Sequence, residues 1–146
     1  FMKRKEFEHC IKENELIETG DKDKALASEL LKLAEHRQNF WEEIKLEEKY
    51  PSLYLEGNYE IIKELCTAIL ALDGWKALNH ECLFAYLKEK KQDLELDFDY
   101  LLELKDTRNA VDYRGVKVSP TVWKQNKMKI QITIKALIGY IKKQLQ

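Results

Sequence analysis

Apolar residues recur at three- and four-residue spacing along most of the chain, which predicts helices rather than strands. The pattern predicts a first helix over about residues 5–19, closed by Gly20, and a second over about 22–46, capped by Asp21. The second helix is expected to turn one apolar face to the core, made of Leu26, Leu30, Leu33 and Trp41.

The middle of the chain continues the helical spacing after Pro51. A third helix is predicted over about residues 53–72 and ends at Asp73-Gly74. A fourth is predicted over about 75–88, followed by a polar turn and by a fifth helix over about 94–113 that Gly115 ends. The third helix carries the apolar stripe Tyr59, Ile62, Leu65, Cys66, Ile69 and Leu72, and the fourth carries Leu78, Cys82 and Ala85.

The last segment contains the one stretch that alternates like a strand, residues 130–134. A longer helical stripe includes it, formed by Trp123, Ile130, Ile134, Leu137 and Ile141, which fall on one face when about 100° is added per residue. Ser119-Pro120 is a cap followed by a first-turn proline, so a sixth helix is predicted over about residues 120–145.

Together these elements predict an all-α fold, an antiparallel up-and-down bundle of four to six helices in a single domain over residues 1–146. A chain of 146 residues that is 45% hydrophobic and 35% charged is long and apolar enough to fold around one core. No apolar run approaches the roughly 20 residues that span a bilayer, so no membrane association is expected. No leader pattern is found, so export is not expected either, and Phe1 before Met2 is interpreted as a cloning remnant.

Cysteine usage bears on the compartment and on metal chemistry. Cys10, Cys66 and Cys82 have no metal-binding spacing and form no even disulfide framework. The prediction is therefore three reduced, buried, inert thiols in a cytoplasmic protein that holds no metal and no cofactor.

Charge is distributed unevenly along the chain. The first 113 residues hold all 26 acidic residues against 17 basic ones, whereas the last 33 residues carry eight positive charges and no negative one. The basic segment either pairs with the acidic body or offers a surface to a polyanion. Its lysines Lys124, Lys135 and Lys142 share one helix face, which fits side chains lying along the core edge as well as a polyanion-binding face.

One short stretch, Asp106 to Gly115 with the sequence DTRNAVDYRG, concentrates chemically useful groups. On a helix, Arg108 and Asp112 face the same way, and so do Asn109 and Tyr113. A salt-bridged helix end accounts for the first pair, but it does not explain Asn109, Tyr113 and Arg114. His80-Glu81 resembles the start of a zinc-protease helix, but Phe84 stands where the second histidine belongs, so His80 is interpreted as helix polarity or as support for another site.

Arg108-Asn109, with Tyr113 four residues after Asn109 near the end of the penultimate long helix, resembles the signature of the HEPN superfamily. That signature begins with an arginine, which is usually followed by Asn, Asp or His. Four to six residues in all then precede a histidine. The resemblance extends over about residues 21–141. The stretches 59–65, 72–78, 80–81 and 112–115 are similar to a mainly archaeal branch of the superfamily.

The resemblance implies a helical bundle that dimerises so that two arginine motifs face each other. It also implies a metal-independent ribonuclease, in which the RNA 2′-hydroxyl attacks the adjacent phosphate and the arginine stabilises the developing charge. Many such proteins are toxins paired with a small nucleotidyltransferase. In this chain Tyr113, Arg114 and Gly115 stand where the histidine belongs, and losing general acid–base help typically costs about 10²–10⁴-fold in rate.

The sequence therefore predicts a homodimeric HEPN-like protein that binds RNA or a nucleotide-like polyanion, or partners a nucleotidyltransferase, with at most weak, degenerate ribonuclease activity. The candidate catalytic residues are Arg108, Asn109, Asp112 and Tyr113. The further ligand-binding candidates are Arg114, Lys124, Glu64 and His80. Two alternatives remain open: an interaction module in which Tyr113 and Arg114 anchor an interface, and a protein in which the Tyr113 hydroxyl is modified by a partner transferase.

Overall fold

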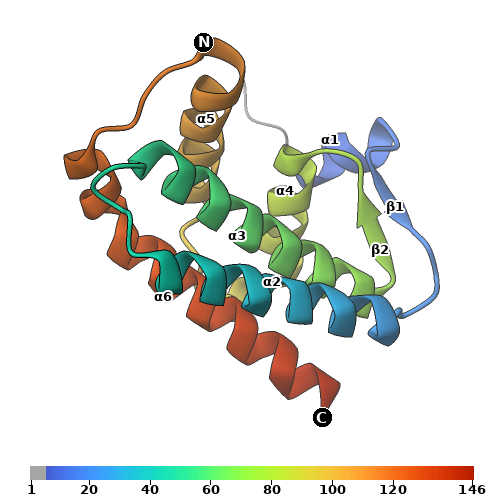
Figure 1. The fold of residues 1–146 in the computed structure, drawn as a ribbon. Helices are drawn as coiled ribbons and strands as arrows, with labels where there is room; N and C mark the ends of the chain where they lie inside the picture. Colours follow the sequence, from blue (N-terminus) through green and yellow to red (C-terminus); the bar gives the residue numbers. More distant parts are fainter. Residues whose placement is uncertain (1–5) are drawn as a thin grey trace.

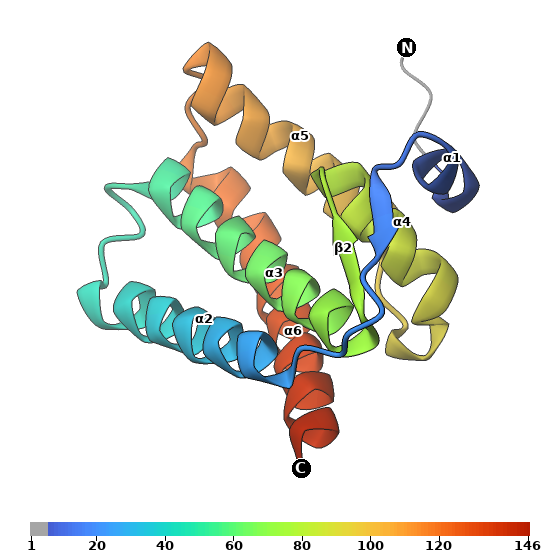
Figure 2. The same cartoon turned by 90° about the vertical axis from the view of Figure 1, so that its right-hand side faces the viewer.

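The computed structural model describes residues 6–146, so the Phe1-Met2 start lies outside the described part of the chain. The six helices are α1 (Phe7–Lys12), α2 (Lys24–Ile44), α3 (Pro51–Asp73), α4 (His80–Lys90), α5 (Phe98–Arg114) and α6 (Pro120–Leu145). Strands β1 (Leu16–Glu18) and β2 (Trp75–Ala77) pair antiparallel, and a 3-10 turn, η1, covers Gln92–Leu94. The predicted all-α bundle is confirmed (Figures 1 and 2), and among the described residues no helix combines the length and apolar character needed to cross a membrane.

Helix α3 is the centre of the molecule. It runs beside α2, and it also contacts α4, α5, α6 and β2 (Figure 2). Most of its side chains are therefore buried, including every residue of the predicted stripe. It begins at Pro51, whose missing N–H costs nothing in a first turn, and ends at Gly74, which adopts the left-handed backbone with φ 78°. Helix α3 therefore positions several residues of the candidate functional site.

Helix α6 matches its predicted bounds. Ser119 accepts a hydrogen bond from the Val122 backbone N–H, and Pro120 occupies the first turn. The stripe predicted for it is buried: Trp123, Ile130, Ile134, Leu137 and Ile141. The alternation at residues 130–134 thus lies within a helix, because a stripe several turns long buries more apolar surface than a five-residue strand.

The predicted core face of α2 is right for Leu30 and Trp41, which are partly buried and pack against the core, and wrong for Leu26 and Leu33. Ala27, Leu31 and Ala34 are buried against the rest of the molecule, whereas Leu26 and Leu33 are exposed. Small alanines allow α2 to approach α3 closely, and this rotates the larger leucines toward solvent. The cap is also Asp23 rather than Asp21: its carboxylate accepts the Leu26 backbone N–H at 2.9 Å.

The predicted helix over 5–19 is replaced by α1 and β1. Asn14 takes a left-handed backbone with φ 56° after the short helix, and the chain then extends so that Leu16 pairs with Ala77. The predicted helix over 75–88 is corrected in the same way: residues 75–77 form β2, and α4 begins at His80, where the Asn79 side chain caps the Cys82 backbone N–H at 2.9 Å. The two three-residue strands are stabilised by pairing with each other. Neither segment is long enough to show a strand pattern in the sequence.

The prediction of three reduced cysteines is wrong for two of them. Cys10 and Cys82 form a disulfide that joins α1 to α4 across 72 positions, while Cys66 is a buried free thiol. The pairing of β1 with β2 brings the two distant cysteines together, which no spacing rule could indicate. Among the described residues, the group of potential metal ligands is Cys10, Glu15 and Cys82, and two of its three donors are bonded to each other.

The disulfide predicts a simple labelling result. In denaturant without reductant, iodoacetamide is expected to alkylate one thiol, Cys66, and after reduction it is expected to alkylate three. Intact-mass spectrometry counts the additions. Three additions before reduction would contradict the Cys10–Cys82 bond.

The close contact of α2 with α3 predicts a steric effect at Gly57. A Cβ at this position would lie 2.3 Å from ring atoms of Trp41, which is itself packed against Phe40 and Tyr54. Gly57→Ala is expected to lower the free energy of unfolding by about 1–3 kcal/mol, as overpacking does. Gly139→Ala is the control, because a Cβ added at this helical position would meet no neighbouring group within 4 Å. This substitution should raise the free energy of unfolding by about 0.5–1 kcal/mol. Urea denaturation measures both, and equal stability of Gly57→Ala and wild type would contradict the close approach.

Candidate functional site

Arg108 lies near the end of α5, and its side chain is largely enclosed, with 15% exposed. Its Nη2 lies 3.0 Å from Oε1 of Glu60 on α3, and its Nε lies 2.9 Å from Oδ2 of Asp112, one turn further along α5. Its Nη1 donates to Oδ1 of Asn109 at 3.3 Å. The pairing of Arg108 with Asp112 predicted from their spacing is confirmed, and the structure adds Glu60 from another helix.

Two aromatic groups form the base of this arrangement. The guanidinium carbon of Arg108 lies 5.8 Å from the ring centroid of Tyr59, close enough for a cation–π contact. The Tyr59 hydroxyl forms a 2.8 Å hydrogen bond with Nδ1 of His80 at the start of α4. Burial raises the pKa of Tyr59, so the phenol keeps its proton. Burial, reinforced by Lys63 and Arg108, lowers the pKa of His80 and favours the neutral imidazole.

A pair of carboxyl groups lies beside Arg108. The carboxyl group of Glu56 on α3 lies close enough to that of Asp112 on α5 for the two to share a hydrogen bond. Two carboxylates can share such a bond only if one of them carries a proton. The hydrogen bond with Asp112, followed by burial and the charge of Asp112, raises the pKa of Glu56 to about 7. Glu56 therefore gains or loses its proton near neutral pH.

The charges in this group nearly balance. Burial disfavours the charged form of Arg108, but Asp112 and Glu60 outweigh it and raise its pKa. Lys63 adds a second positive charge, with its Nζ 2.9 Å from Oε2 of Glu60. While the carboxyl pair holds its shared proton, two cations face two anions. We call Arg108, Asn109, Asp112, Glu56 and Glu60 the Arg108 cluster.

The other predicted site residues are distributed more widely. The Tyr113 phenol is within hydrogen-bonding reach of Arg108, yet 76% of the residue is exposed. Arg114 ends α5 on the exposed surface. Glu64 is buried and pairs with Arg37 of α2 at 2.7 Å, so the acidic contact to Arg108 on α3 comes from Glu60, one turn earlier. His80 is hydrogen-bonded to Tyr59, whose ring contacts Arg108.

Four of the eight cations in the basic C-terminal segment form ion pairs within the fold. Lys124 pairs with Glu48, and Lys127 lies 2.9 Å from Glu47, a residue that also accepts the indole N–H of Trp123. Lys129 pairs with Asp97 and Lys142 with Glu35. The acidic body of the chain and the basic helix α6 therefore contact each other through ion pairs. Lys124 forms one of these pairs.

Glu56 and Glu60 were not among the site residues predicted from the sequence. Each is an ordinary acidic residue of a mostly apolar helix, and neither belongs to a motif. One signal was available: Glu56, Glu60, Lys63 and Thr67 follow one another at helical spacing, which places a narrow polar stripe on a helix that is otherwise buried. Comparison of the chain with protein-family models, with curated proteins and with solved structures gave no match.

The carboxyl pair predicts a pH-dependent stability. Because the folded-state pKa of Glu56 is raised from 4.5 to about 7, its contribution to stability is complete below pH 4.5 and is lost as the pH rises through 7. Glu56→Gln keeps a hydrogen-bonding group without the charge. It should equal wild type at pH 5 and exceed its free energy of unfolding by about 1 kcal/mol at pH 8, a figure discounted for partial exposure.

Urea denaturation at both pH values tests this expectation. Glu89→Gln removes an exposed carboxylate at the far end of α4 and is the control. A Glu56→Gln variant that differs from wild type by the same amount at pH 5 and pH 8 would show that no proton is shared.

Proposed function

We propose that the chain is a HEPN-like protein that binds RNA through the Arg108 cluster and cleaves it slowly without a metal. The observation that carries the proposal is the Glu56–Asp112 carboxyl pair next to an enclosed arginine. The arginine can bind a phosphate, and Glu56, with a pKa of about 7, titrates in the range that the absent motif histidine would cover. Asn109, which contacts Arg108, is the hydrogen-bonding companion.

The proton shared by the pair removes an obstacle to phosphate binding. An ionised Asp112 alone repels the charge that Arg108 would stabilise. With one proton between Glu56 and Asp112, the pair carries a single negative charge, and Arg108 and Lys63 balance it together with Glu60. Phosphate binding is therefore favoured below about pH 7 and weakens above it.

The proposed cleavage reaction uses the proton that Glu56 and Asp112 share. The ionised member of the pair accepts the proton of the RNA 2′-hydroxyl as the 2′-oxygen attacks phosphorus, and Arg108 stabilises the charge on the phosphorane. The protonated member gives its proton to the departing 5′-oxygen, which leaves a 2′,3′-cyclic phosphate and a 5′-hydroxyl and restores one proton to the pair. Carboxyl pairs that share a proton perform comparable transfers in aspartic proteases.

The setting of the proposed activity follows from the resemblance. A homodimer would bring two Arg108 clusters together, and a nucleotidyltransferase is the proposed partner. The cytoplasm is the proposed compartment, although the premise of reduced cysteines no longer supports it. Intracellular proteins of hyperthermophilic archaea are rich in disulfides, so the Cys10–Cys82 bond is compatible with that compartment in the branch that the sequence resembles.

One observation favours a second candidate, a protein-interaction module. Tyr113 is a large aromatic residue exposed at the end of α5, and tyrosine is frequent among residues that dominate interface energies. In that case Tyr113 contacts a partner, or its hydroxyl accepts a group from a transferase. Salt separates the candidates, because RNA binding weakens steeply as salt rises and an apolar contact does not.

Fluorescence anisotropy with a labelled mixed-sequence RNA, in EDTA, tests binding. Arg108→Ala is expected to weaken binding by about tenfold or more, the loss typical of a charge-assisted hydrogen bond. The affinity of wild type should fall between pH 6 and pH 8, and Glu56→Gln should abolish this pH dependence. Lys32→Ala removes the same charge from the exposed face of α2 and is the control.

Cleavage is followed in the same samples by gel analysis of cyclic-phosphate products. Glu56→Gln is expected to slow cleavage by about 10²-fold or more. Asn109→Ala is the second site variant, because it removes a contact to Arg108 without leaving Glu60 and Asp112 unpaired. RNA binding that is equal in wild type, Arg108→Ala and Asn109→Ala would refute the proposed site.

A further inference from the structure

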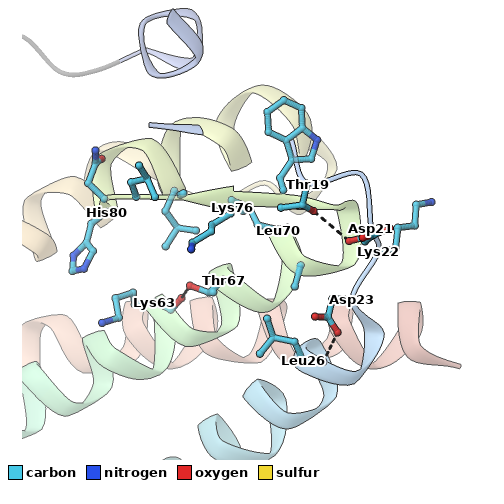
Figure 3. Close-up of a pocket in the computed structure, with 16 residues that line it drawn as sticks. Thr19, Asp21, Lys22, Asp23, Leu26, Lys63, Thr67, Leu70, Lys76 and His80 are labelled. Atoms are coloured by element: carbon cyan, nitrogen blue, oxygen red, sulfur yellow. Dashed lines mark hydrogen bonds between the residues drawn. The ribbon is translucent and has the colours of Figure 1, made fainter. Parts of the chain in front are cut away.

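A separate cavity of about 830 Å³ lies on the surface of α3, beyond His80. Strand β2 and the start of α4 form one wall, the start of α2 forms the other, and α3 forms the floor (Figure 3). We call it the α3–β2 cleft. Its volume is in the range of sites that hold small molecules.

The walls of the cleft are mainly aliphatic. Leu26 and Leu78 line it and are unusually exposed for leucines, at 44% and 56%. Leu70, Ala71 and Leu83 contribute buried surface around them. Exposed leucines that border one cavity provide apolar surface that a ligand can remove from water.

The cleft offers little to a nucleobase. Trp75 is its one aromatic ring apart from the imidazole of His80, and that ring packs against Phe7 and Tyr86, with centroids 6.2 and 5.5 Å away. Base recognition usually relies on stacking against an available aromatic face. The apolar part of a fitting ligand is therefore an aliphatic chain.

The polar groups of the cleft are separated by charge. Lys63, Lys76 and His80 extend toward the same end, and Thr67 lies on the floor beside them (Figure 3). Asp21 and Asp23 lie at the opposite end. Lys63 already pairs with Glu60, whereas within residues 6–146 the structure places no carboxylate within ion-pair distance of Lys76. Lys76 is thus a cation directed at an apolar cavity.

His80 adds a donor at the cationic end. Its Nδ1 is bonded to the Tyr59 hydroxyl, and the phenol, which keeps its proton, can donate to it. A neutral imidazole that accepts at Nδ1 carries its hydrogen on Nε2. That N–H lies on the side of the ring away from Tyr59 and is suited to an anionic oxygen.

We propose that the α3–β2 cleft binds an aliphatic anion, a methylene chain that ends in a carboxylate or phosphate. The head group lies between Lys63, Lys76 and His80, and the chain covers Leu26 and Leu78. Lys63 also pairs with Glu60, but Lys76, Leu26 and Leu78 take no part in the Arg108 cluster, so variants at these positions test the cleft separately from RNA binding.

Isothermal titration calorimetry with octanoate, octyl phosphate, 1-octanol and inorganic phosphate tests the cleft. Octanoate or octyl phosphate should bind one per chain, and whichever is tighter identifies the head group. The alcohol and the free phosphate should each bind at least tenfold more weakly, because each lacks one half of the recognition. Lys76→Ala should weaken octanoate or octyl phosphate binding about tenfold, Lys76→Arg should retain it, and Lys88→Ala at the far end of α4 is the control.

The location is tested by backbone amide chemical shifts. Shifts caused by octanoate or octyl phosphate should centre on Thr67, Lys76 and Leu78. Leu78→Asp, an exposed position where the fold tolerates a charge, should abolish binding without lowering Tm. The proposal is overturned if 1-octanol binds as tightly as octanoate and octyl phosphate, if shifts centre elsewhere, or if none of the compounds binds.

Discussion

Burial of α3 is the constraint on which the rest of the structure depends. The helix is enclosed by α2, α6, α5, α4 and β2, and its apolar residues supply much of the core. Polar groups on such a helix must find partners, because an unpaired buried polar group costs about 1–3 kcal/mol. Asn58 accordingly donates to the Tyr54 carbonyl at 2.8 Å, and Glu64 binds Arg37. Charged residues from neighbouring helices are in this way drawn to α3.

The proposed sites occupy the strip of α3 that its neighbours leave uncovered. Glu56, Glu60, Lys63 and Thr67 follow one another along this strip. Arg108 reaches its first half from α5, and His80 and Lys76 reach its second half from α4 and β2. The first half is dominated by ion pairs and the second by aliphatic surface. One helix face therefore supports two kinds of chemistry, set by the elements that border it.

The predictability of the fold follows the length of each pattern. Helices α3 and α6 were predicted well because stripes several turns long and clear end signals, Gly74 and Ser119-Pro120, agree with each other. The α1–β1 segment was predicted wrongly because its three-residue strand is stabilised by residues 57 to 61 positions away. The face of α2 was predicted only in part, because its fully buried residues are Ala27, Leu31 and Ala34 rather than Leu26 and Leu33.

The contacts of the candidate site also differ in how far they could be predicted from the sequence. Pairs on one helix, such as Arg108 with Asp112, can be read from spacing. Contacts across helices cannot, and so Glu56, Glu60 and the Tyr59–His80 hydrogen bond were found only in three dimensions. The Cys10–Cys82 bond belongs to the same class, since it depends on how β1 meets β2.

Tyr59 has a consequence that concerns the two proposed sites together. One face of its ring lies beneath Arg108, and its hydroxyl holds His80. A group that binds His80 would act on the same phenol that Arg108 contacts, so Tyr59 is the route by which the two proposed sites would be coupled. By thermodynamic reciprocity, whatever factor an occupant of the α3–β2 cleft imposes on affinity at Arg108, an occupant at Arg108 imposes on the cleft.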